Sequence, residues 1–142
     1  MELLKKYHLS ECAKIISPSL PGEKSKVLLK LQSEIEGSVV SYPKNMPIAI
    51  KRAKGSIIED VDGNQFIDFF GGCGVLNVGH GNEYVLEYVK EQQAELIHAL
   101  DFPTENKLTL IQLILKNLPA EIQDEYKVSF GGPTGSDAIE AA

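Results

Sequence analysis

The sequence contains no tryptophan and only two cysteines, Cys12 and Cys73, among its 142 residues. Two cysteines are too few for the disulfide framework of a small secreted domain, so we expect free thiols and a cytoplasmic protein. No apolar run approaches the roughly 18 residues that a membrane-spanning helix requires. The N-terminus has an early acidic residue, Glu2, and no sustained apolar stretch, which is unlike a signal peptide. We therefore expect no membrane partner.

Positive charge is also scarce. Lysine and arginine number 14 against 20 acidic residues, which gives a net charge of -6. Nucleic-acid binding needs clustered cations, and the basic runs at 5–6 and 51–54 are short and offset by nearby acids. We interpret both runs as solvated surface and expect no nucleic-acid partner. The length suits one ordinary domain, and a two-domain enzyme of about 400 residues cannot be complete in this chain.

Helical spacing, turn signals and alternation predict a mixed α/β order of elements. Asp62-Gly63 supplies the positive φ that a tight hairpin turn needs, and Pro119 ends a helix. The expected elements are a short amphipathic helix between residues 3 and 16, a helix capped by Ser25 and stopped by Gly37, an extended stretch that opens at 41–43, a hairpin of 57–60 and 65–68, helices beginning near Asn82 and Thr104, and a strand at 126–130.

Eight of the 12 glycines lie at 71–81 and 131–135, which marks two loops for function. The second loop joins the expected strand to a helix, and a helix N-terminus presents unpaired N–H groups and a partial positive charge. Thr134, Gly135 and Ser136 could therefore hold an anion such as a monophosphate. An ordinary capped turn is the alternative.

Two sharper phosphate motifs are excluded. A P-loop requires a lysine after the glycines, and Asp137 follows Ser136 instead. A dinucleotide fingerprint would require glycine where Asn77 stands. In the first loop, Cys73 and His80 could form a nucleophile–base pair or bind a metal. Because no third ligand or metal-binding spacing accompanies them, we favour Cys73 as a small residue in a tight loop and expect no metal site.

Several motifs, in a fixed order, resemble the N-terminal part of class III pyridoxal-phosphate-dependent aminotransferases. Within that class, the Ser-Tyr-Pro, Arg-Ala-Lys-Gly and Gly-Pro-Thr-Gly stretches look most like diaminobutyrate–2-oxoglutarate aminotransferases. The resemblance implies the aspartate-aminotransferase architecture (fold type I), an α/β fold with a large parallel-sheet domain and a smaller domain. The motifs lie at 41–43, 51–55, 59–68, 77–80 and 132–142.

The resemblance also implies roles for residues. Gly135 and Ser136, with Thr134 as a neighbour, would hold the phosphate of pyridoxal 5'-phosphate. Cys73 and Gly74 match positions on the substrate side of the active site. The implied domains are a variable N-terminal helical segment (1–40), the hairpin and Gly-rich loop of the small domain (41–81), and the start of the cofactor-binding large domain (82–142).

The family chemistry needs a Schiff-base lysine, an acid at the cofactor nitrogen and an aromatic ring over the cofactor. All three follow the phosphate loop in family order, whereas Lys107, Lys116 and Lys127 precede it. We therefore expect no catalytic residue in this chain, and no activity from the chain alone.

The parent enzyme would be a homodimer that transfers an amino group from an amino acid, for example a diamino acid, to 2-oxoglutarate or a similar oxo acid. Two alternatives stay open. One is an amino-acid racemase or epimerase of the same fold, and the other is a non-catalytic truncated remnant.

The apolar residues of the later helices and of the expected strand would face partners that this chain lacks. We therefore expect poor solubility or self-association of the isolated chain, visible by light scattering. A clean monomer that unfolds cooperatively would contradict this expectation. The residues concerned are Leu108, Ile111, Leu115, Val128 and Phe130.

Overall fold

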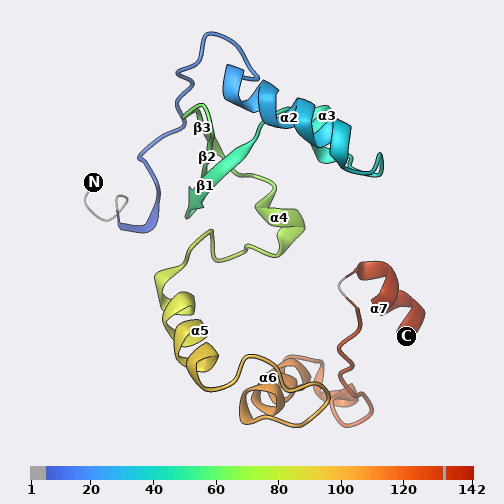
Figure 1. The fold of residues 1–142 in the computed structure, drawn as a ribbon. Coiled ribbons are helices and arrows are strands. Elements are labelled where there is room, and N and C mark those ends of the chain that lie inside the picture. The colour runs from blue at the N-terminus through green and yellow to red at the C-terminus, as the bar shows by residue number, and fades with distance from the viewer. Residues whose placement is uncertain (1–5, 133) are drawn as a thin grey trace. The chain divides into compact units, whose positions relative to one another are not determined.

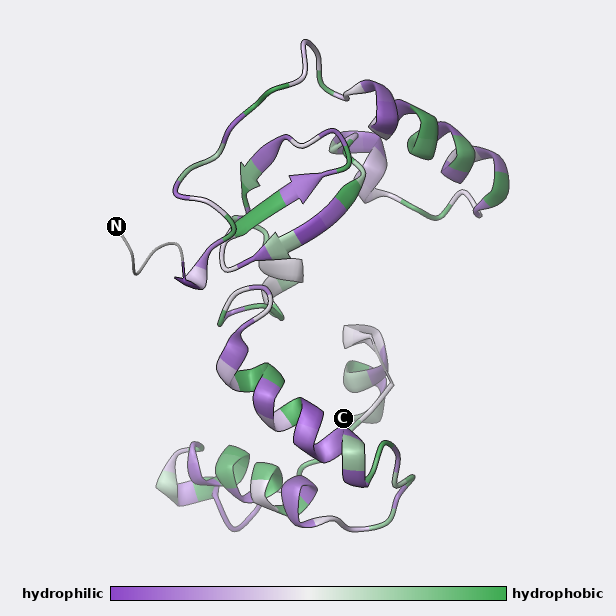
Figure 2. Cartoon of the chain, turned by 60° about the vertical axis from the view of Figure 1, so that its left-hand side comes forward, coloured by the Kyte–Doolittle hydropathy of each residue, from purple (hydrophilic) through white to green (hydrophobic). Residues whose placement is uncertain are grey.

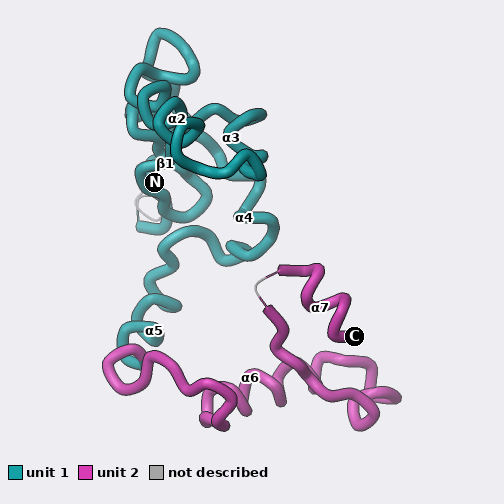
Figure 3. The backbone as a smooth tube through the Cα atoms, turned by 45° about the vertical axis from the view of Figure 1, so that its right-hand side comes forward, with its two compact units in different colours: residues 1–92 teal, residues 93–142 magenta. Residues whose placement is uncertain are grey.

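A computed structural model describes residues 6–132 and 134–142 of the chain. The chain divides into two compact units, residues 1–92 and residues 93–142 (Figure 3). The first unit contains a small sheet with helices, and the described part of the second contains helices and irregular segments. Both glycine-rich loops are described except for Pro133, which lies outside the described residues.

The sheet of the first unit has three antiparallel strands in the order β1-β2-β3 (Figure 1). The expected hairpin is confirmed, because β2 and β3 flank a turn in which Gly63 adopts a φ of +90°. The sequence did not predict β1, since its basic residues suggested only solvated surface. The strands span Ile50–Lys54 (β1), Ile57–Asp60 (β2) and Gln65–Ile67 (β3).

The segment before the first long helix runs along the sheet as an irregular strap. The Leu9 N–H donates to the Lys54 carbonyl at 3.2 Å, and Lys14 exchanges two backbone hydrogen bonds with Gln65 at 2.9 and 2.8 Å. The expected helix over 3–16 is therefore wrong for residues 8–16, because their backbone groups pair with strand edges. The first residues of that prediction, 3–5, lie outside the described residues.

The interior of the first unit is mostly polar. Among the described residues Ile57 is the one buried hydrophobic side chain, whereas four polar or charged residues are buried. The Asp60 carboxylate accepts hydrogen bonds from the Asp62 N–H at 2.9 Å and from the Asn64 N–H and side-chain amide at 2.8 Å each. Asp60 therefore fixes the turn between β2 and β3. The buried polar set is Ser25, Glu59, Asp60 and Asn64.

The same turn holds the strap through the other end of the Asn64 side chain. The Asn64 Oδ1 accepts the backbone N–H groups of Ile16 and Ser17 at 2.9 Å each and the Ser17 hydroxyl at 3.0 Å. Since the Asn64 amide donates to Asp60, one buried side chain joins the strap to the hairpin.

Asp62 in the turn caps helix α2 (Glu23–Ile35) across almost forty residues of sequence. Its carboxylate accepts the N–H groups of Lys24 at 2.8 Å and Ser25 at 2.9 Å, and the Ser25 hydroxyl at 2.6 Å. The expectation that Ser25 caps this helix is therefore wrong, since Gly22 is the N-cap and a Cβ there would overlap the Asp62 carboxylate. The helix ends at Ile35, two residues before Gly37. The hydrogen bond from Ser25 holds the pKa of Asp62 below its usual value although burial opposes this shift.

Two expected helix starts are confirmed. The Asn82 Oδ1 accepts the Val85 N–H at 3.2 Å before α5, and the Thr104 hydroxyl accepts the Lys107 N–H at 3.2 Å before α6. Helix α6 ends at Lys116, three residues before the expected stop at Pro119, with Asn117 as its C-cap. The remaining elements are α3 (Tyr42–Asn45), α4 (Gly71–Gly74), α5 (Glu83–Glu95), α6 (Glu105–Lys116), a 3-10 turn (Ala120–Ile122) and α7 (Gly135–Ala141).

Two segments expected to be extended are not. The extended stretch expected to open at 41–43 begins instead with the short helix α3, where Pro43 occupies the first turn and its missing N–H costs no hydrogen bond. Residues 126–130 have no regular secondary structure, because a strand requires a hydrogen-bonded neighbour and the described part of the chain provides none there.

Apolar side chains remain exposed in both units. Figure 2 shows hydrophobic stripes along the longer helices, and Leu108 and Phe130 are 48% and 50% exposed. These exposures are consistent with the expected self-association, which stays a prediction. Within the described residues, no helix is both long and apolar enough to cross a membrane.

The three strands also carry a polar ladder across the sheet. Arg52 on β1 donates to both Glu59 oxygens at 2.9 Å each, and Gln65 on β3 donates to the same carboxylate at 2.9 Å. These hydrogen bonds, led by those from Arg52, lower the pKa of the buried Glu59 from 4.5 to about 2 although burial opposes the shift.

We predict that Asp60→Ala destabilises the chain by about 2–4 kcal/mol, because it leaves three donors without their buried acceptor. Urea unfolding followed by circular dichroism measures the loss. Asp124→Ala, at an exposed position, is the matched control and should change stability by less than about 0.5 kcal/mol. Equal effects of the two substitutions would contradict the central role of Asp60.

We predict a second, pH-dependent effect at Glu59. A folded-state pKa of about 2 against an ordinary value of 4.5 gives stability that is present above pH 4.5 and lost as pH falls toward 2. The free energy of unfolding should therefore fall more steeply over this window in the natural chain than in Glu59→Gln. Glu125→Gln, at an exposed position, should keep the natural slope. Identical slopes for all three chains would exclude this linkage.

Candidate active-site loops

Both ends of the first glycine-rich loop attach to the turn between β1 and β2. At its start, the Asp68 N–H donates to the Ser56 carbonyl at 2.8 Å. At its end, His80 and Gly55 exchange two backbone hydrogen bonds at 2.8 and 2.9 Å. Gly79 packs against Gly55 so closely that a Cβ would lie 3.0 Å from the Gly55 Cα. Since Gly55 and Gly79 also have positive φ, glycine is required at both positions.

The Asp68 side chain joins the two ends of this loop. One oxygen accepts the N–H groups of Phe70 at 2.9 Å and Gly71 at 2.8 Å, and the other lies 2.7 Å from His80 Nε2. Burial raises the pKa of Asp68, but the hydrogen bonds from Gly71, His80 and Phe70 outweigh it and lower the pKa overall. Asp68 is thus a carboxylate with every oxygen engaged.

The structure places Cys73 and Gly74, the expected substrate-side residues, in the middle of this loop with positive φ angles of 61° and 89°. The Cys73 Sγ lies 3.1 Å from the Tyr42 hydroxyl, and this contact raises the pKa of Tyr42. The Tyr42 ring meets Phe70 edge to face at 5.2 Å. Sequence reasoning missed Tyr42, because a separation of 31 residues leaves no spacing signal.

The structure gives no support for a nucleophile–base pair of Cys73 and His80. The His80 ring pairs with Asp68, whereas the Cys73 thiol contacts Tyr42. Over residues 6–132 and 134–142, no group of three or more His, Cys, Asp or Glu side chains is arranged to hold a metal ion. The reactive groups at this loop are therefore the Cys73 thiol and, in contact with it, the phenol of Tyr42.

The second glycine-rich loop leads into helix α7 in the second unit. Thr134 is extended, with φ −116° and ψ 152°, and its hydroxyl accepts the Asp137 N–H at 3.3 Å. The Asp137 carboxylate lies against Gly132. Gly135 and Ser136 begin the helix, so their N–H groups have no acceptor within it, and open space surrounds Gly135. This turn is the one in which the sequence predicts a phosphate held by backbone donors, and that assignment stays a prediction.

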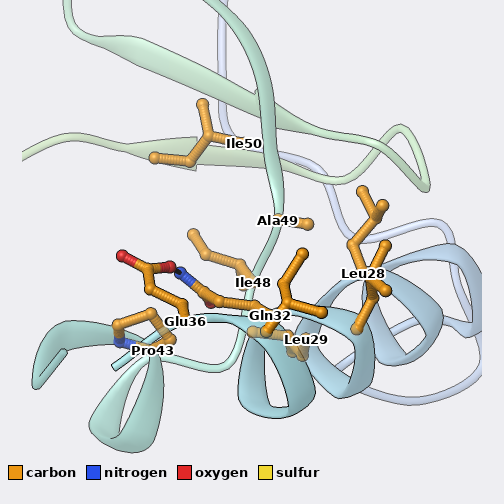
Figure 4. Close-up of a pocket in the computed structure, with 10 residues that line it drawn as sticks. Leu28, Leu29, Gln32, Glu36, Pro43, Ile48, Ala49 and Ile50 are labelled. Atoms are coloured by element: carbon orange, nitrogen blue, oxygen red, sulfur yellow. Dashed lines mark hydrogen bonds between the residues drawn. The ribbon is translucent and has the colours of Figure 1, made fainter. Parts of the chain in front are cut away.

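The first unit also contains an open groove of about 660 Å³ between α2, α3 and the segment leading into β1 (Figure 4). Its lining is mainly apolar and includes Leu28, Leu31 and Ile48. The Gln32 amide donates to the Glu36 carboxylate at 2.8 Å at this surface. The groove therefore offers apolar contact and no catalytic group.

Comparison with known families decides the identity of this arrangement. The model of the family "Aminotransferase class-III" matches residues 39–142, which include both glycine-rich loops. The chain belongs to the class III aminotransferases. The resemblance found in the sequence motifs is thereby confirmed, and the cofactor of this family is pyridoxal 5'-phosphate.

Curated relatives point to one activity within the class. The chain is 38% identical over 116 residues to a diaminobutyrate–2-oxoglutarate aminotransferase of Rhizobium meliloti, covering 80% of this chain and 25% of that protein. A Haemophilus influenzae enzyme of the same name is 35% identical over 116 residues, with the same coverage. The chain thus spans about a quarter of the length of these relatives.

Solved structures confirm the expected fold class. An acetylornithine aminotransferase from Elizabethkingia anophelis superposes with a TM-score of 0.64 at 20% identity, covering 82% of this chain and 28% of that one. An ornithine aminotransferase from Toxoplasma gondii superposes with a TM-score of 0.56 at 19% identity, covering 82% and 26%. The chain therefore has the fold of the N-terminal portion of fold type I enzymes.

Proposed function

We propose that the whole protein is an aminotransferase that moves an amino group from a diamino acid, with diaminobutyrate as the first candidate, to 2-oxoglutarate. The supporting observation is the family match over 39–142 together with relatives of 34–38% identity that carry this activity in their names. These alignments include 80% of the chain, so the similarity is not confined to one motif.

The proposed cofactor contacts lie in the turn before α7. The bound cofactor supplies the electron sink for amino transfer, and the protein supplies binding and orientation. Gly135 and Ser136 would donate backbone N–H groups to the phosphate, and the Ser136 hydroxyl would add a donor. The hydroxyl of Thr134 already accepts the Asp137 N–H, so Thr134 acts first as the helix cap that orients these donors.

The remaining parts of the proposal concern substrate and assembly. Cys73 and Gly74 would face the substrate, where the small side chains leave room for a longer amino acid. The protein would be a cytoplasmic homodimer, and its domains would follow the division into 1–40, 41–81 and 82–142. These assignments follow from the family and stay predictions.

The activity is tested with the whole gene product, cofactor, diaminobutyrate and 2-oxoglutarate. Glutamate formation that requires both substrates is the expected result. Racemisation or epimerisation of an amino acid without any oxo acid would replace the proposal with the alternative enzyme class. Failure of a folded, cofactor-loaded protein to turn over any amino acid would favour the non-catalytic alternative.

The phosphate site is tested by removing one backbone donor without removing the helix. Gly135→Pro deletes the N–H at the first helical position, where proline is well tolerated and the extended Thr134 suits a following proline. Loss of a charge-assisted hydrogen bond should weaken cofactor affinity about 10- to 100-fold in an absorbance titration.

Glu105→Pro is the matched control, because Glu105 is the first residue of α6 and follows the equally extended Thr104. This variant should bind the cofactor like the natural protein. Equal affinity of the Gly135 variant and the control would place the phosphate elsewhere.

A further inference from the structure

We propose that Asp68 and His80 act together as positioning residues, forming a clamp that closes the loop 69–79 and sets Cys73 against Tyr42. The clamp consists of the Asp68 carboxylate, its two backbone donors at the start of the loop, and the His80 ring at the end. The functional meaning of the clamp, a fixed substrate-side surface, rests on the proposed function.

Few other side-chain contacts hold the shape of the loop. The Phe70 ring packs edge to face on Tyr42 at 5.2 Å, but Phe69 and Val75 are 93% and 80% exposed, so apolar burial contributes little. Its internal backbone hydrogen bonds include those from Leu76 to Gly71 at 2.9 Å and from Gly79 to Leu76 at 2.8 Å. The polar contacts at the two ends of the loop therefore carry much of its stability.

The loop also contains backbone strain that must be offset. Residues 71–74 have φ angles between 55° and 89°, and one of these residues, Cys73, has a side chain. A residue with a side chain occupies this left-handed region only at an energetic cost. Such a conformation persists only when the surrounding structure holds it. The clamp joins the two ends of the loop through side chains, in addition to the backbone hydrogen bonds that attach both ends to the turn between β1 and β2.

The geometry of the clamp fits a positioning role for Asp68 and His80 and not a role in proton transfer. The Asp68 side chain is only 6% exposed and both its oxygens are engaged, while the His80 ring, 24% exposed, points its Nε2 at that carboxylate. The backbone of His80 pairs with that of Gly55, so His80 is fixed to the turn between β1 and β2. Loss of the hydrogen bond between the His80 ring and Asp68 would therefore loosen the loop while the sheet stays folded.

The test uses the reactivity of the Cys73 thiol in the whole gene product. N-ethylmaleimide labelling followed by peptide mass spectrometry gives the rate at Cys73 separately from that at Cys12 and at any other cysteine. His80→Ala removes the donor to Asp68, whereas His80→Gln keeps an amide N–H near the position of Nε2. Asp68→Ala removes the carboxylate that His80 contacts. His98→Ala, at an exposed histidine, is the matched control.

We expect His80→Ala and Asp68→Ala each to raise the labelling rate about two- to tenfold, the equivalent of one lost hydrogen bond. The double variant should match the single variants, because the two residues act as one unit. His80→Gln and His98→Ala should label at the rate of the parent. An unchanged rate in His80→Ala, or an equal rise in His98→Ala or His80→Gln, would overturn the proposal. Loss of the circular dichroism signal in His80→Ala would also overturn it, since the pair would then hold the fold and not the loop.

The second readout uses the whole gene product. If the loop faces the substrate, His80→Ala should raise the KM for the amino donor about two- to tenfold and change kcat less, and His80→Gln should restore KM. An unchanged KM in an active protein would exclude the substrate-side role. If the natural protein has no transaminase activity, the proposed function fails, while the labelling rates still decide whether the clamp exists.

Discussion

The fully buried carboxylate of Asp60 is the interaction on which the first unit depends. It fixes the turn between β2 and β3, and that turn then provides Asn64 to hold the N-terminal strap and Asp62 to cap α2. Since few apolar side chains are buried in this unit, these charge-assisted hydrogen bonds take over the organising role that a hydrophobic core has in most domains.

The same principle extends from the sheet to the loop that we associate with the substrate. Asp68 follows β3 directly and repeats the pattern of Asp60, with one oxygen on backbone N–H groups and the other on a side chain. Glycines at 55 and 79 let two backbone segments approach closely enough for His80 to reach this carboxylate. A carboxylate at the end of β2 and another directly after β3 therefore hold the loops that follow these two strands.

The sequence predicted local structure correctly where the signal depends on neighbouring residues. The hairpin at 57–67 and the helix caps Asn82 and Thr104 depend on neighbours within a few residues, and each formed as predicted. Predictions failed where the partner is remote. Ser25 looks like a helix cap until Asp62 takes that role, and residues 126–130 resemble a strand although no strand pairs with them among the described residues.

The sequence by itself determined the family, because its motifs follow one another in the order of the class III family, and the family model matches residues 39–142. It also located the turn before α7, since a helix start after glycines is a local property. Only the tertiary structure decided that Tyr42 meets Cys73 and that Asp68 meets His80. The physical reason is that a hydrogen bond between distant residues depends on the path of the backbone between them, and residue types alone do not specify that path.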